Sequence, residues 1–387
     1  VAYYLPASLV GKVLGPHWTA PASLAWAFAG VFLAFAWVAR LGRPHGGAVL
    51  ATFFFVDGFA WLPGLYVLAQ RIGVSPGTPA GHWWDTALFT ERISSFGAPP
   101  VRLLLECEPT HLLWVPQHAI AAWLATACIL RSLEQGEPPR HAGFVVAATL
   151  LWSPFVTVGL LPFAALAVMR QPRASLSWPG LAGGAALALP AGLYFLAHAA
   201  YQYLGFLPAR FDGALDWARY LLFLADSIGA MVVAVSLVRR RAGLPPPREW
   251  TVFLLAAAWL AVTTVIVMGY WDDWVMRVSM PALMAFRLAV ARVAVGFWRR
   301  GGPLLPRLAF AAVVALSAER SLKVCALAPF GKVGRRPADT TIVTATHAAP
   351  TLGELAGSAG WEYGSQYLGS LDSFFGRHLL RGAPPRE

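Results

Sequence analysis

The stretch that decides the fold is Ala20–Ala39, which reads APASLAWAFAGVFLAFAWVA and contains no charged side chain. It is about as long as the ~20 apolar residues that an α-helix needs to cross the hydrocarbon core of a bilayer. Arg40 and Arg43 follow it directly, as basic residues do at the cytoplasmic end of a membrane helix. The segment therefore predicts a transmembrane helix that runs from outside to inside.

Comparable apolar segments recur along most of the chain. The predicted spans are Ala20–Ala39, Gly47–Ala69, Leu113–Leu130, Trp178–Ala200, Ala218–Val238, Trp250–Tyr270, Val278–Trp298 and Pro303–Leu322. A ninth region, Gly143–Met169, is interrupted at Ser153-Pro154 and at Pro162, and basic loops flank both its sides, so we predict two half-helices that form a re-entrant pair. The predicted fold class is all-α: a polytopic transmembrane helical bundle of about eight spans, with that pair and a small extracytoplasmic C-terminal tail.

The composition agrees with a membrane protein. The 387 residues are 57% hydrophobic and 13% charged, which leaves too little polar surface to cover a soluble globule of this size. The net charge of +11 resides in short loops beside apolar segments, without a basic stripe interleaved with aromatics, and this argues against nucleic acid. Cys107, Cys128 and Cys325 have no CxxC or metal-ligand spacing. We therefore expect membrane lipid as the surrounding partner and no cofactor, and leave a divalent metal open.

Basic residues of the short loops set the predicted orientation. If Gly143–Met169 is re-entrant, the basic residues of the short loops all lie on one side of the membrane. They are Arg40, Arg43, Arg131, Arg140, Arg170, Arg173, Arg239, Arg240, Arg241, Arg248, Arg299, Arg300 and Arg307. The positive-inside rule makes this face cytoplasmic. We thus divide the chain into a transmembrane helical domain, residues 1–322, with an extracytoplasmic loop at 71–112, and a small extracytoplasmic C-terminal segment, residues 323–387.

Polar and aromatic residues gather in two predicted outer segments, the 71–112 loop with the helix start that follows it, and the turn Trp271–Arg277. Aromatic faces stack on sugar rings, a carboxylate can act as general base toward an acceptor hydroxyl, and Arg or His can neutralise a phosphate leaving group. The candidate catalytic residues are Asp85, Glu91, Asp272 and Asp273, and the candidate substrate-binding residues are His82, Trp83, Trp84, His111, Gln117, His118 and Arg277. The alternative interpretation is an interfacial aromatic belt with solvated loop charges.

Ionisable residues lie inside predicted spans, among them Asp57, Asp226, Arg287 and Arg292. Ionisable groups at bilayer depth are costly, and they usually pair or line a cavity. Asp57 and Arg287 fall at similar depth, so we predict that they pair. If these groups instead face a water-filled path, the protein is a transporter, although the chain lacks the matched broken helices in two halves that are typical of inverted-repeat transporters.

The layout of many spans, a long outer loop, a Pro-broken pair at Leu151–Pro162 and a small outer tail resembles the GT-C superfamily of polytopic glycosyltransferases. Local motifs are similar to those of bacterial membrane proteins with GT-C-like organisation: Tyr3–Ala7, Trp114–His118, Asp273–Pro281, Gln366–Ser370 and Asp372–Phe375. The resemblance implies transfer of a sugar from a polyprenyl-phosphate-linked donor to a lipid-linked or cell-surface glycan acceptor. It places that reaction on the extracytoplasmic side of the bacterial plasma (inner) membrane.

The chain departs from the superfamily pattern at its start. The resemblance implies an acidic residue in the first outer loop, but Val1–Thr19 contains no Asp or Glu. Either a first transmembrane helix and this acid lie upstream of Val1, as we expect, or the protein has lost this chemistry, so no residue is carried over as the catalytic base. Two other functions stay open: a transporter or flippase of a lipid-linked or small polar solute, and a non-catalytic membrane protein of envelope assembly.

Overall fold

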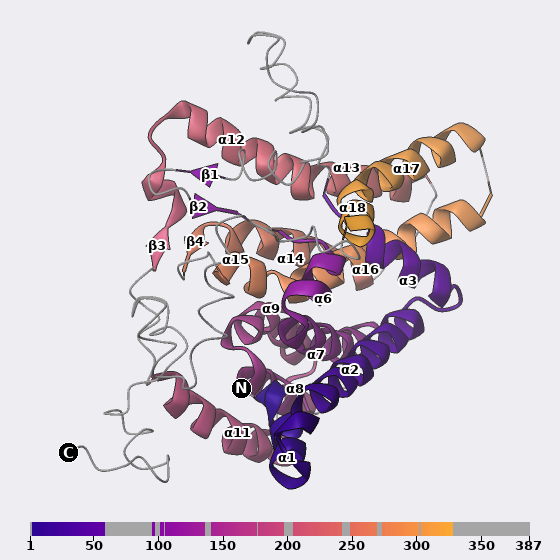
Figure 1. Cartoon of the computed structure of the whole chain (residues 1–387). Coiled ribbons are helices and arrows are strands. Elements are labelled where there is room, and N and C mark those ends of the chain that lie inside the picture. The colour runs from indigo at the N-terminus through magenta and orange to yellow at the C-terminus, as the bar shows by residue number, and fades with distance from the viewer. Residues whose placement is uncertain are drawn as a thin grey trace.

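The computed structural model describes residues 2–58, 95–96, 101–103, 105–135, 141–175, 177–196, 204–241, 248–268, 273–301 and 303–327. Helices dominate these ranges (Figure 1). They are α1 (Leu5–Leu14), α2 (Thr19–Leu41), α3 (Gly46–Phe55), α6 (Glu108–Trp114), α7 (Pro116–Gln135), α8 (Ala142–Trp152), α9 (Pro154–Arg170), α10 (Pro172–Ser175), α11 (Trp178–Leu196), α12 (Ala214–Leu224), α13 (Ala230–Arg241), α14 (Arg248–Thr263), α15 (Asp273–Val278), α16 (Met280–Arg299), α17 (Leu304–Ser317) and α18 (Glu319–Leu327). The predicted all-α class is confirmed.

Strands are minor elements of the described chain. β1 (Ser95–Phe96) pairs with β2 (Val101–Arg102), and β3 (Gly205–Phe206) pairs with β4 (Ile266–Val267), both antiparallel. Two-residue pairings of this kind fasten loops to one another and form no sheet with a core of its own.

Three helical stretches of the described chain are long and apolar enough to cross a membrane: Pro16–Leu41, Ala214–Arg239 and Met280–Arg299. They coincide with three of the predicted spans. In the first of them only 11% of the most apolar window is buried, and Phe28 and Phe32 are more than 70% exposed. So much apolar surface without a protein partner suits a lipid environment. The structure therefore indicates association with a membrane.

Other predicted spans correspond to shorter helices. In the predicted span Trp250–Tyr270 the helix α14 ends at Thr263. A run of β-branched residues follows, and such residues favour extended backbone. The hydroxyls of Thr263 and Thr264 also bond back to carbonyl oxygens of the last helical turn. Within Pro303–Leu322 the helix α17 ends at Ser317, and in Gly47–Ala69 the helix α3 ends at Phe55.

The predicted break at Ser153-Pro154 is present. Ser153 separates α8 from α9 in extended backbone, and its hydroxyl accepts a hydrogen bond from the Val156 N–H at 3.4 Å. The Thr157 hydroxyl bonds the Ser153 carbonyl oxygen and the Thr149 hydroxyl, so the polar groups of the break find partners. Pro162, in contrast, lies inside α9 and does not end it. Neighbouring helices can stabilise an internal proline of this kind in an apolar bundle.

After this break the chain comes back to the start of α8. A Cβ atom added to Gly184, near the start of α11, would lie 3.1 Å from the carbonyl oxygen of Gly143, near the start of α8. The first turns of α8 and α11 are therefore in contact, and the chain between them leaves and comes back. How this hairpin lies relative to a membrane face stays a prediction.

Helix α16 forms the centre of the core. Most residues from Met280 to Ala291 are buried, and α16 packs against α3, α7 and α14. Figure 1 shows α16 inside the helical assembly, with α3 along it and α6 and α18 close to α3. Phe286 of α16 stacks on Phe253 of α14, with ring centroids 4.9 Å apart. This packing fixes the position of the next residue, Arg287.

Gly159 allows α9 to approach the end of α15 closely, and we expect it to tolerate no side chain. A Cβ added there would lie 2.1 Å from the Val278 carbonyl oxygen. Gly159→Ala should therefore lower stability by about 1–3 kcal/mol through overpacking, measured as denaturant-induced unfolding of the purified full chain in detergent. Gly192→Ala in α11 is the matched control, because its added Cβ meets nothing within 4 Å. Equal stabilities of the two variants would show that the close approach is absent.

Candidate functional site

Arg287 is the centre of a buried ionic network. Its guanidinium donates a hydrogen bond from Nη2 to Asp57 Oδ1 at 2.6 Å and another to the Glu106 carbonyl oxygen at 2.9 Å. Nη1 forms an ion pair with Glu108 Oε1 at 2.9 Å. The three side chains of the ion pairs are each less than 5% exposed. The predicted pairing of Asp57 with Arg287 is thereby confirmed.

Local structure brings the carboxylates to this arginine. Asp57 follows the end of α3, where Val56 turns into extended backbone. Glu108 stands in the first turn of α6, where a negative charge is favourable beside the helix N-terminus. Helix α6 packs against α3, so the two carboxylates approach Arg287 from neighbouring elements.

His111 joins the network one helical turn after Glu108, with its Nδ1 atom 3.2 Å from Glu108 Oε2. Burial alone would raise the pKa of Glu108, but the charge of Arg287 and the hydrogen bond with His111 outweigh it and hold that pKa below its ordinary value. Glu108 is thus an anion in the folded protein. Both His111 and Glu108 are fully buried, so His111 here contacts a protein carboxylate.

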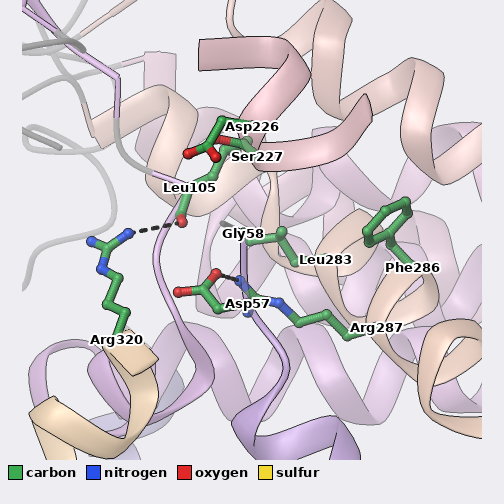
Figure 2. Close-up of a pocket in the computed structure, with 9 residues that line it drawn as sticks. All are labelled: Asp57, Gly58, Leu105, Asp226, Ser227, Leu283, Phe286, Arg287 and Arg320. Carbon is green, nitrogen blue, oxygen red and sulfur yellow. Dashed lines mark hydrogen bonds and ion pairs between the residues drawn. The ribbon is translucent and has the colours of Figure 1, made fainter. Parts of the chain in front are cut away.

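A second arginine approaches the same segment from α18. Arg320 pairs with Glu106 Oε2 at 2.5 Å and donates a hydrogen bond to the Leu105 carbonyl oxygen at 3.4 Å. Figure 2 shows Arg320 and Arg287 reaching this region from opposite sides. The two arginines therefore fasten residues 105–108, the end of the predicted outer loop, to α16 and α18.

A small cavity of about 20 Å³ lies within this network (Figure 2). It is lined by Asp57, Gly58, Leu105, Asp226, Ser227, Leu283, Phe286, Arg287 and Arg320. Its volume suffices for one water molecule. Asp57 Oδ2 and Asp226 Oδ1 are buried and have no hydrogen-bond partner among the described residues. One bridging water would satisfy both oxygens, as buried waters do at polar sites.

Asp226 owes its position to a π-helical turn, Ala225–Gly229, which joins α12 to α13. A π-turn carries one residue more than an α-turn, and such turns are frequent at functional sites. The side chain is buried, and the described residues offer it no ion pair, in contrast to Asp57. Among the described residues, Asp226 is therefore the carboxyl of the cavity that forms no ion pair.

Arg292, the last of the four charged residues singled out above, contacts different elements. It binds both carboxylate oxygens of Glu134 in α7, at 2.6 and 2.9 Å, and donates a hydrogen bond to the Leu41 carbonyl oxygen at the end of α2. This contact links three helices and belongs to the scaffold.

A second cluster contains residues that the sequence predicted for substrate binding. Arg277 of α15 lies over the ring of Phe155, 5.8 Å from its centroid, and Phe155 is in edge contact with Trp274. The charge of Arg277 reaches the imidazole of His118, in the first turn of α7, and Gln117 precedes it, half-buried. His118 Nδ1 is buried, with no hydrogen-bond acceptor or donor beside it among the described residues. Helix α9 packs against both α7 and α15, so His118 and Arg277 lie on helices that share a neighbour. We call His118, Phe155, Trp274 and Arg277 the His118–Arg277 cluster.

The other predicted site residues lie outside the described residues. They are His82, Trp83, Trp84, Asp85, Glu91 and Asp272. Asp273 begins α15, but its side chain is not among those described. The predicted cavity between the 71–112 loop and the Trp271–Arg277 turn therefore stays a prediction.

Sequence reasoning missed the second half of the ionic network. Glu106 and Glu108 lie at the end of the predicted 71–112 outer loop, and Arg320 lies within the predicted span Pro303–Leu322. The rule that singled out Arg287, a charge inside an apolar segment, also applies to Arg320. Nothing in the sequence around Glu108 indicates that the loop folds back into the core.

Metal chemistry has no support in the part of the chain that is described: no group of three or more His, Cys, Asp or Glu residues there could hold a metal ion. Comparisons with protein-family models, with curated proteins and with solved structures found no match to this chain.

Proposed function

We propose that this protein is a membrane glycosyltransferase that transfers a sugar from a polyprenyl-phosphate-linked donor to a lipid-linked or cell-surface glycan acceptor on the extracytoplasmic side of the bacterial plasma membrane. The observation that carries the proposal is the His118–Arg277 cluster. Its residues come from three elements far apart in the sequence, and they combine a guanidinium, an imidazole and two aromatic rings.

The chemistry of this cluster suits a phosphorylated sugar. A guanidinium presents its N–H groups in a planar fork that matches phosphate oxygens. Helices α7 and α9 both begin here, at Pro116 and Pro154, and their N-termini add positive potential. The rings of Phe155 and Trp274 supply apolar faces on which a sugar can stack. The missing component is a catalytic carboxylate, for which Asp85, Glu91, Asp272 and Asp273 are the candidates.

In this proposal the chain crosses the membrane about eight times, and Gly143–Met169 re-enters from the cytoplasmic side. The 71–112 loop and residues 323–387 then lie outside. The contact between the first turns of α8 and α11 supports the re-entrant arrangement, and the three long apolar helices support the spans. The ionic network has a supporting role here, because it holds the end of the 71–112 loop against α16.

Replacing Arg277 tests the donor site. Arg277→Gln should weaken binding of a labelled polyprenyl-phosphate sugar to the purified full-length protein roughly 10- to 100-fold, because it removes a charged hydrogen-bond donor. Arg219→Gln is the control, since Arg219 forms a partly exposed ion pair with Asp216 in α12. Arg277→Lys should restore binding only in part, because a lysine cannot form the planar fork. Unchanged donor binding in Arg277→Gln would remove this residue from the site.

A second function, transport of a small polar solute, is favoured by a separate observation. Asp57 and Asp226 share a water-sized cavity, and each has an oxygen without a hydrogen-bond partner among the described residues. Buried carboxyls of this kind occur in proton relays of transporters. Asp226→Asn distinguishes the two functions: it should abolish solute uptake into proteoliposomes if the protein is a transporter, and leave sugar transfer intact if it is a glycosyltransferase.

A further inference from the structure

A groove of about 500 Å³ lies between α3, α16 and α17, and it shares no lining residue with the small cavity or the His118–Arg277 cluster. Its lining comes from three segments, 48–56, 294–299 and 307–318. The volume is within the ~300–1,000 Å³ of typical ligand sites. Many alanines line it, and their short side chains leave the space open between the three helices.

The groove is elongated and apolar along most of its length. Along α17 and its C-cap residue its lining extends from Arg307 to Ala318, roughly 16 Å at a rise of ~1.5 Å per residue. On α3 it extends from Ala48 to Val56. The hydroxyl of Thr52 is engaged with the Ala48 carbonyl oxygen of its own helix. A polar ligand would therefore find few partners along these walls, whereas a hydrocarbon chain needs none.

One end of the groove is basic. Arg299 ends α16, and Arg307 stands in the first turn of α17, so both guanidinium-bearing residues flank the same interhelical turn. Arg307 lies over the ring of Trp298, 5.0 Å from its centroid, and this contact holds the side chain at the groove. Arg307 Nε is buried and has no hydrogen-bond acceptor among the described residues. An anion at this end would supply one.

We propose that this groove binds an acyl chain of an anionic phospholipid, with the lipid phosphate against Arg299 and Arg307. Charge complementarity selects the headgroup, and the alanine-lined walls accept the hydrocarbon. By the positive-inside assignment the basic end faces the cytoplasmic leaflet, whose anionic lipids attract arginines near the surface. The site is separate from the His118–Arg277 cluster, so this proposal does not depend on the glycosyltransferase proposal.

Lipid binding to the purified full chain tests the proposal by native mass spectrometry in detergent, with dioleoyl phosphatidylglycerol and dioleoyl phosphatidylcholine as probes. We expect the anionic lipid to be retained preferentially. Arg299→Gln and Arg307→Gln should each reduce its retention roughly fivefold, and Arg307→Lys should keep most of it. Ala315→Phe should reduce retention of both lipids, because Ala315 is an exposed residue of the groove wall and a phenyl ring would fill the space.

The matched control is Arg239→Gln. Arg239 lies over the ring of Trp250, 4.3 Å from its centroid, on the same predicted face but outside the groove. It should leave lipid retention unchanged, and thermal unfolding of each variant reports whether it is folded. Equal retention of the two lipids, an equal loss in Arg239→Gln, or full retention in a folded Ala315→Phe protein would each overturn the proposal. Full lipid retention in the folded Ala315→Phe protein is also the result expected if another segment of this chain, and not a lipid, occupied the groove.

Discussion

Arg287→Ala should destabilise the protein by about 3–5 kcal/mol, the cost of breaking a buried ion pair by removing one partner. The physical reason is that the substitution leaves Asp57 and Glu108 as buried carboxylates without their cation. It also removes the hydrogen bond to the Glu106 carbonyl oxygen, one of the contacts that hold the end of the 71–112 loop. The measurement is the unfolding midpoint of the purified full chain in detergent, by loss of helical circular dichroism.

Two further variants test whether the loss of stability is specific to the buried ionic network. Arg219→Ala breaks a partly exposed ion pair with Asp216 and should cost less than about 1 kcal/mol. A triple variant, Arg287→Met with Asp57→Asn and Glu108→Gln, removes the charges together and should recover part of the stability, because no buried charge stays unpaired. If Arg287→Ala is no less stable than Arg219→Ala, the network contributes nothing to the fold.

Replacing the catalytic carboxylate should slow sugar transfer by roughly 10²- to 10⁴-fold, the usual contribution of a general base. Asp85→Asn and Asp273→Asn are the variants, since these residues belong to the two predicted outer segments. Donor affinity should be largely kept, because the base acts on the acceptor hydroxyl and the donor phosphate is assigned to Arg277. Single-turnover transfer from a labelled polyprenyl-phosphate sugar separates the two effects.

The control for this experiment is Asp216→Asn, a carboxylate in the ion pair of α12. It should leave the transfer rate unchanged. If Asp85→Asn and Asp273→Asn also leave transfer at the level of the unmodified protein, the proposed site is wrong. The transporter function, with Asp57 and Asp226 as its polar groups, would then become the better explanation.

The sequence predicts those features of the fold that depend on a single segment. Ala20–Ala39 is apolar on every face, and it lies within a long helix as expected. Ser153-Pro154 also interrupts its helix as predicted, because the rule about proline is local. The pairing of Asp57 with Arg287 could be inferred because a charge in an apolar span demands a partner.

Prediction fails where tertiary packing overrides local character. Glu106, Glu108 and His111 have the polarity of a solvated loop, yet the structure buries them between α3, α16 and α18. Their burial depends on two arginines that lie far later in the sequence, at positions 287 and 320. The π-turn around Asp226 likewise has no sequence signal in the pattern of apolar residues. Contacts of such large sequence separation cannot be read from one segment at a time.

The sequence separation of Asp57 and Arg287 also affects how the protein folds during its synthesis. Asp57 and Arg287 are 230 residues apart, so at ~5–20 residues per second the carboxylate precedes its cation by roughly 10–45 s of synthesis. During that interval the nascent N-terminal half carries Asp57 and Glu108 without the arginine that makes their burial favourable. Burial of these carboxylates is therefore unfavourable until α16 leaves the ribosome, and the order of translation couples the two halves of the chain.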